Sequence, residues 1–192
     1  MKTRILLFNS SPEDLLDIEE ALANSAYEIV QRCSRISDIS RAIIKSDVDM
    51  LMAVTDKKFD QLFTCVKQIN QLKPVPVVVF TYEDDRDVIQ AAIKAGVSAY
   101  IVDGLQAKRI VPILETARIR FMEQQVIKDE LDRTRETLSE RKLIERAKGI
   151  VMQRSNIDEE EAYKSMRKMA MDKNIKLSEL AKSVISAAEL IM

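Results

Sequence analysis

Five short apolar runs, separated by segments with helical periodicity, divide the first half of the chain. The runs are ILLF (5–8), YEIVQ (27–31), MLMAV (50–54), PVPVVVF (74–80) and SAYIV (98–102). Short runs of this kind are typical of buried strands, and apolar residues recur every three or four positions between them. Strands that alternate with helices predict an α/β fold with a parallel, doubly wound, flavodoxin-like sheet. Only 3 glycines and 4 prolines in 192 residues disfavour a loop-rich barrel.

A single long helix is predicted from Lys108 to Arg154, where the only helix-weakening residues are Pro112 and Gly149. Its first turns carry an apolar stripe that we expect to pack on the sheet: Ile110, Leu114, Ala117 and Phe121. Four side chains then recur at 4-3-4 spacing among charges, the pattern of a short coiled coil: Ile127, Leu131, Thr134 and Leu138. This seam predicts a homodimer, although the helix could instead fold back on its own chain.

Two further helices are expected after the long one, so the α/β region is followed by an all-α, three-helix bundle. Asp158 with Glu161 three residues later has the spacing of a capping box, and DKNIK (172–176) predicts a turn before a last helix from Leu177. The middle helix has an apolar stripe that we expect to be buried: Ala162, Met166, Met169 and Ala170. Gly149 costs a helix about 1 kcal/mol relative to alanine, and we expect close packing against a neighbouring helix to explain it. We divide the chain into domains 1–122 and 139–192, joined by a coiled-coil linker, 123–138.

Composition excludes several classes of function. The chain has no histidine, which excludes histidine-based acid–base catalysis and most zinc sites. Its two cysteines, Cys33 and Cys65, form no spacing motif and are expected to be reduced core thiols. The amino-terminal apolar run is too short for a secretory or membrane segment, so we expect a cytoplasmic protein. The net charge is −1, but residues 139–192 hold 11 Lys/Arg against 9 Asp/Glu, which permits a local cationic face.

The first domain resembles the receiver domain of two-component response regulators. Thr81 ends the fourth predicted strand, where receivers carry a hydroxyl that contacts the phosphoryl group. Tyr100 lies in the fifth, where receivers carry an aromatic residue that reports activation. The resemblance therefore implies a phosphorylation site at the carboxyl ends of these strands.

The residues that would perform phosphorylation are missing from that site. The acceptor position is Val54, the acidic pair is replaced by Asn9 and Ser10, and the expected lysine is Asp103. Phosphoryl transfer to a carboxylate needs that acceptor and a metal held by acidic neighbours. We therefore expect a degenerate receiver with no enzymatic activity, no metal and no cofactor. Asp56 could serve as a displaced acceptor, but no acidic pair would hold the metal there, so we favour a loop aspartate that caps the next helix.

The carboxyl-terminal domain resembles the ANTAR domain, an RNA-binding module of bacterial transcription antiterminators. The resemblance rests on Ala147-Lys148-Gly149, Met152, the EEAY of residues 160–163, Arg167, Ala170-Met171, Leu177 and Ala181. A degenerate receiver, a coiled coil and this module in one chain are similar to the AmiR/NasT group. Within that group the chain looks most like the antiterminator of nitrate assimilation.

A cluster of basic residues supports RNA contact without that resemblance. Between residues 164 and 176 there are five cations against one acid, Asp172, and we call the five the cationic ridge: Lys164, Arg167, Lys168, Lys173 and Lys176. Such a ridge could bind phosphates, and Tyr163 beside it could stack on an unpaired base. Lys148 and Arg154 could extend the ridge. The alternative is an ordinary solvated helix face.

The resemblance implies a dimeric antiterminator that binds stem-loops in nascent leader mRNA and prevents the terminator hairpin from forming. It further implies nitrate or nitrite assimilation genes as targets. Control would come from a ligand-sensing partner, NasS-like or AmiC-like, instead of phosphorylation. Two alternatives remain: a DNA-binding response regulator with a helix-turn-helix, and a scaffold that binds only proteins. The last helix argues against the first, because after Lys182 it offers few side chains that could contact base edges.

Overall fold

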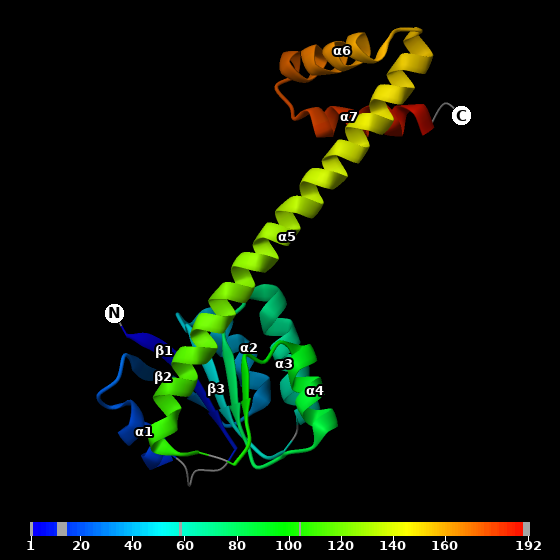
Figure 1. Ribbon diagram of the computed structural model, residues 1–192. Helices are drawn as coiled ribbons and strands as arrows, with labels where there is room; N and C mark the ends of the chain where they lie inside the picture. The colour runs from blue at the N-terminus through cyan, green and yellow to red at the C-terminus, as the bar shows by residue number, and fades with distance from the viewer. Residues whose placement is uncertain (1, 11–14, 58, 104, 190–192) are drawn as a thin grey trace. The chain divides into compact units, whose positions relative to one another are not determined.

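The computed structural model describes residues 2–10, 15–57, 59–103 and 105–189. The chain forms two compact units, Met1–Gln125 and Val126–Met192. Helix α5, Ala107–Ser155, contributes its first turns to the first unit and its remaining turns to the second (Figure 1). The predicted long helix is therefore present within one residue of both expected ends.

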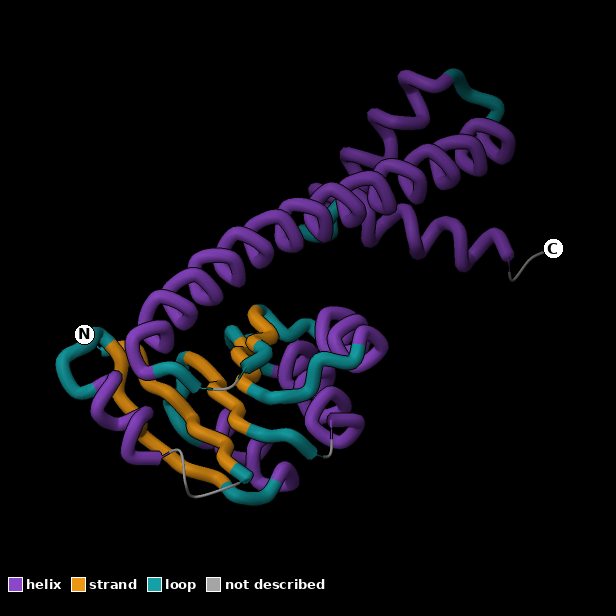
Figure 2. Tube along the Cα trace, turned by 60° about the horizontal axis from the view of Figure 1, so that its bottom comes forward, coloured by secondary structure: helices purple, strands orange, loops and turns teal. Residues whose placement is uncertain are grey.

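The first unit contains a five-stranded parallel sheet in the order β2-β1-β3-β4-β5. Its strands are coloured orange in Figure 2. The strands are β1 Thr3–Asn9, β2 Tyr27–Cys33, β3 Met50–Val54, β4 Val77–Phe80 and β5 Ala99–Ile101. This order is the doubly wound order of flavodoxin-like folds, and it confirms the predicted class. Chain direction and order together bring the carboxyl ends of β1, β3 and β4 to one edge of the sheet.

Helices cover both faces of this sheet. Helices α2 (Ile36–Lys45), α3 (Phe59–Leu72) and α4 (Arg86–Ala95) share one buried cluster with one face of the strands. Helix α1 (Leu15–Leu22) and the first turns of α5 share a second cluster with the other face. Three residues of the predicted α5 stripe are buried there: Ile110, Leu114 and Ala117. The fourth, Phe121, is only partly buried and lies outside the cluster, so the stripe ends earlier than expected.

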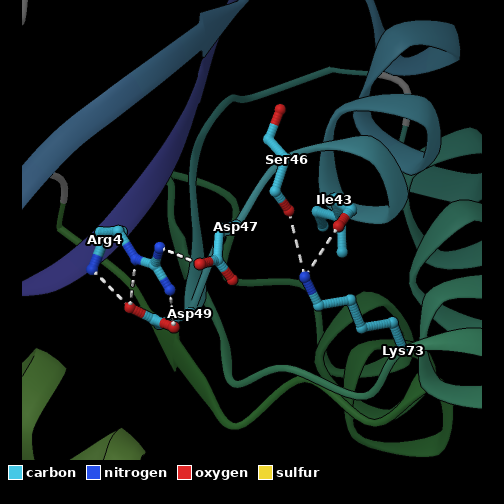
Figure 3. Close-up of polar contacts among 6 residues, drawn as sticks. All are labelled: Arg4, Ile43, Ser46, Asp47, Asp49 and Lys73. Carbon is cyan, nitrogen blue, oxygen red and sulfur yellow. Dashed lines mark hydrogen bonds and ion pairs between the residues drawn. The ribbon is translucent and has the colours of Figure 1, made fainter.

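Polar contacts fix the ends of several elements in this unit (Figure 3). Arg4 in β1 donates from its backbone amide and its Nε to Asp49 Oδ2, at 2.9 and 3.1 Å. The hydrogen bond from this guanidinium holds the pKa of the Asp49 carboxyl below its ordinary value. Lys73 Nζ donates to the carbonyl oxygens of Ile43 and Ser46, both at 3.1 Å, where α2 ends. Arg4 and Asp49 thus join β1 to the start of β3, and Lys73 binds carbonyl groups at the carboxyl-terminal end of α2.

The second unit packs the last turns of α5 against α6 (Glu159–Asp172) and α7 (Leu177–Glu189). Its buried cluster comprises Ala147, Met166, Ala170, Leu180, Ala181 and Ile185. Asp158 Oδ1 accepts from the amide of Glu161 at 2.8 Å, so the predicted aspartate cap begins α6. Helix α5 ends at Ser155 and is followed by Asn156, whose φ of 50° lies in the left-handed region that asparagine tolerates.

Two expectations for this unit are wrong. Met169, predicted to be buried, is 44% exposed. A Cβ atom added to Gly149 would meet nothing within 4 Å, so packing inside this chain does not explain the glycine.

Candidate nucleic-acid interface

The cationic ridge lies along the exposed side of α6 and in the turn that follows. Arg167 and Lys168 are exposed on the helix, and Lys173 and Lys176 are exposed in the turn. Within the described part of the chain, no ion pair involves the side chains of these four residues. They are therefore open to an external anion.

The turn that carries Lys173 and Lys176 has a defined backbone geometry. The amide of Ile175 donates to the carbonyl of Ala170, and that of Asn174 to Met171, both at 3.0 Å. This pair of bonds is a Schellman motif, with Asn174 at a φ of 52° in the left-handed position. The motif fixes the backbone around Asn174, with Lys173 directly before it and Lys176 two residues after it.

Lys164 and Tyr163 complete the predicted ridge at its amino-terminal end. Lys164 Nζ pairs with Glu160 Oε1 at 2.6 Å, and both side chains are largely exposed. Exposed pairs of this kind contribute little and are screened by salt, so a phosphate can compete for the lysine. Tyr163 is 42% exposed, which leaves part of its ring accessible.

Apolar side chains lie exposed among these cations, and the sequence interpretation missed them. Met169, Met171 and Ile175 have exposed fractions of 44%, 70% and 36%. Met171 follows Ala162 by nine positions, which places it on the opposite side of α6 from that buried residue. The helical spacing from Ala162 could therefore have predicted that Met171 is exposed. Apolar groups beside cations suit a partner that presents both bases and phosphates.

Lys148 and Arg154 have roles inside the bundle. Lys148 is only 8% exposed, and its Nζ contacts Glu145 Oε2 at 2.6 Å and Glu159 Oε1 at 2.7 Å. Hydrogen bonds to Glu145 and then Glu159 raise the pKa of this lysine. Arg154 donates to the carbonyl of Ala188 at 3.4 Å, near the end of α7. Both residues join α5 to a neighbouring helix, and their contribution to the ridge stays a prediction.

The predicted coiled-coil seam is exposed on α5. Ile127, Leu131 and Leu138 have exposed fractions of 65%, 46% and 54%, and Thr134 Oγ1 donates to the carbonyl of Glu130. Helix α5 continues through the seam without a break, and the described residues of this chain do not fold back to cover it. A single chain therefore leaves this apolar row in water.

The residues predicted to form a degenerate phosphorylation site lie at or beyond the carboxyl ends of the strands. Asn9 and Val54 are paired in register at the ends of β1 and β3, and the amide of Ser10 donates to the carbonyl of Val54 at 3.1 Å. Val54 is 8% exposed. Asp103 is exposed beyond β5 with a φ of 70°. Among the described residues, no group of three His, Cys, Asp or Glu side chains is arranged to hold a metal ion.

Asp56 organises the loop between β4 and α4. Its Oδ1 accepts from Thr81 Oγ1 at 2.7 Å and from the amide of Tyr82 at 2.6 Å. The Tyr100 hydroxyl donates to the carbonyl of Glu83 at 3.0 Å, and burial raises the pKa of that hydroxyl. The carboxylate thus holds the loop that follows β4. Whether Asp56 also caps the next helix stays a prediction.

Comparison with known proteins identifies relatives of the second unit and of nearly the whole chain. The sequence profile of the ANTAR domain matches residues 132–185. The transcriptional regulatory protein PdtaR of Mycobacterium tuberculosis is 28% identical over 186 residues, which cover 95% of this chain and 89% of PdtaR. The nitrate regulatory protein of Klebsiella oxytoca is 36% identical over 83 residues, which cover 43% of this chain and 20% of that protein.

Solved structures resemble the receiver-like part of the chain. A response regulator from Thermotoga maritima has a TM-score of 0.54 at 15% identity, covering 61% of this chain and 98% of its own. The chemotaxis protein CheY4 of Vibrio cholerae has a TM-score of 0.53 at 16% identity, with coverages of 61% and 99%. At these identities the likeness shows the fold alone. None of the described helices is long and apolar enough to cross a bilayer.

Proposed function

We propose that this chain, in which a receiver-like domain precedes an ANTAR domain, is an RNA-binding transcription antiterminator. It binds stem-loops in nascent leader mRNA and prevents formation of the terminator hairpin. The observation that carries the proposal is the row of open cations on α6 and its turn, interleaved with accessible Tyr163 and Met171 side chains. Cations bind the phosphates, and the accessible side chains contact unstacked loop bases.

A helix-turn-helix that reads duplex DNA fits the second unit less well. The exposed side chains of α7 after Lys182 are Ser183, Ser186, Ala187 and Glu189. A recognition helix inserts long donors and acceptors into the major groove, and these residues supply almost none. A scaffold that binds only proteins would not need a row of open cations.

Homodimerisation through the α5 seam is part of the proposal. Burying Ile127, Leu131 and Leu138 against the same residues of a second copy removes three exposed apolar side chains from water. Two ANTAR domains on one dimer would bind two neighbouring stem-loops. The second loop would then bind at a high effective concentration.

Control is assigned to a ligand-sensing protein of the NasS-like or AmiC-like kind. Val54 carries no carboxylate at the acceptor position, which favours an input by contact with a partner over phosphorylation of that position. The similarity to a nitrate regulatory protein supports genes of nitrate or nitrite assimilation as the targets.

Comparing RNA with duplex DNA across a salt series tests this function. The RNA probe is a leader transcript with two adjacent stem-loops closed by hexanucleotide loops. We expect it to bind about 100-fold more tightly than a duplex of the same length. With four open cations, the plot of log K against log salt should have a slope of roughly −3. Equal affinity for both would favour non-specific binding, and tighter binding of the duplex would favour the DNA-binding alternative.

A further inference from the structure

A pocket of about 290 Å³ lies between β5 and the first turns of α5, wholly within the first unit. Apolar side chains from both elements form its floor: Ala99, Ile101, Ile113 and Ala117. Small-molecule sites are typically concave and mostly apolar, with a few placed polar groups, and this volume lies near their lower limit. The pocket is separate from the degenerate phosphorylation site and from the cationic ridge.

Three cations border this apolar floor: Lys108, Arg109 and Arg120. All three are exposed, and no acidic residue is among the described residues that line the pocket. Within the described residues, no ion pair involves them. By contrast, Arg118 on the same helix is paired with Glu115 at 2.6 Å. The helix thus neutralises one arginine outside the pocket and leaves the pocket cations open.

The position of Lys108 and Arg109 is electrostatically unfavourable in the isolated chain. Both lie in the first turn of α5, which contains no acidic residue. The amino-terminal end of a helix carries a partial positive charge, so cations there are repelled and anions are attracted. Helices α4 and α6 follow the usual rule and have acidic residues in their first turns. An anion bound beside Lys108 and Arg109 would relieve this repulsion.

We propose that the pocket binds a small amphipathic organic anion, a carboxylate with a short aliphatic chain. The carboxylate lies against Lys108 and Arg109 at the start of α5. The aliphatic chain extends over Ile113 and Ala117 toward Arg120, which borders the far end of the pocket. The cavity, the open cations and the missing first-turn acid each point to the same ligand chemistry.

Three simple probes separate head group from chain in the full-length protein. Sodium octanoate carries both, sodium acetate carries only the head group, and 1-octanol carries only the chain. We expect saturable binding of octanoate by calorimetry or by shifts of NMR signals from α5 and β5. Acetate and octanol should each bind at least about tenfold more weakly, because a charge-assisted hydrogen bond or several buried methylenes is lost. Each methylene added between butyrate and octanoate should tighten binding by roughly twofold to fourfold.

Substitutions locate the site. Arg109→Gln combined with Lys108→Gln should weaken octanoate binding about tenfold or more, and Arg120→Gln should have a smaller effect. Arg86→Gln is the matched control for the single Arg120→Gln substitution, since Arg86 is an exposed cation in the first turn of α4 and does not line the pocket. Thermal melting curves of all variants report whether the fold is kept. We expect unchanged melting temperatures, because all the substituted side chains are exposed.

Several results would overturn the proposal. If octanol bound as tightly as octanoate, the pocket would select only for apolar groups. If acetate bound as tightly as octanoate, binding would depend only on charge. An equal loss of affinity in Arg86→Gln would show that the overall charge matters and the pocket does not. Absence of saturable octanoate binding would overturn it as well, including the case in which a second copy of the chain covers the pocket.

Discussion

Replacing Arg167 and Lys168 together by alanine should weaken binding of the leader RNA by roughly 10-fold to 100-fold. Both side chains are exposed on α6 and form no ion pair within the described residues, so the fold should be unaffected. Removing two phosphate contacts should also make the slope of log K against log salt less negative by about 1.4. Fluorescence anisotropy of labelled RNA, repeated over a range of potassium chloride concentrations, measures both quantities.

The matched control removes two neighbouring cations elsewhere in the same unit. Arg141 and Lys142 are exposed on α5 and lie outside the ridge, so their double alanine variant has the same net charge as the ridge variant. We expect it to keep most of the affinity and most of the salt slope. If both double variants lose affinity equally, net charge governs binding and the ridge has no special role.

Replacing Leu131 and Leu138 by aspartate should convert the protein from a dimer to a folded monomer. A fully buried leucine contributes about 1.5–3 kcal/mol, and a dimer would bury four of them, so dimer affinity should fall by at least about 1,000-fold. Both side chains are already exposed in the single chain, so the variant should keep its helical circular dichroism. Sedimentation equilibrium at several protein concentrations determines the association state.

Thr137→Asp serves as the control for that variant. Thr137 is exposed and immediately precedes Leu138, so it flanks the apolar row without belonging to it, and the substitution adds one of the same charges. It should leave the dimer intact. A wild-type protein that sediments as a monomer, or a seam variant that remains dimeric, would contradict the predicted interface. RNA with two stem-loops should lose more affinity than RNA with one when the dimer is broken.

The three central strands of the sheet were predictable because burial on both faces leaves continuous apolar runs. All five residues of β3 are buried, and the run at 50–54 coincides with the strand. The strand predicted at 74–80 starts too early, because β4 begins at Val77. Pro76 lacks a backbone donor, and its carbonyl accepts from the amide of Leu51 where the strand begins.

The environment of individual charges was much less predictable. Lys148 looks like any other cation in the sequence, yet it is enclosed by Glu145 and Glu159. The spacing of three residues to Glu145 was a usable signal, whereas Glu159 meets Lys148 only because the chain turns at Asn156. For Gly149 the error runs the other way. A glycine inside a helix suggested a closely packed neighbour, but no described residue outside its own stretch of helix lies within 4 Å of a Cβ added there. Such contacts depend on tertiary packing, which periodicity does not encode.

Transcription through a leader that ends in an intrinsic terminator tests the central claim most directly. With purified RNA polymerase and this protein alone, we predict that the full-length fraction of transcripts rises with protein concentration. The Arg167→Ala, Lys168→Ala variant should leave that fraction close to its value without protein, and the Arg141→Ala, Lys142→Ala variant should behave like wild type. Termination that is unchanged at protein concentrations saturating the stem-loop RNA would contradict antitermination by this chain.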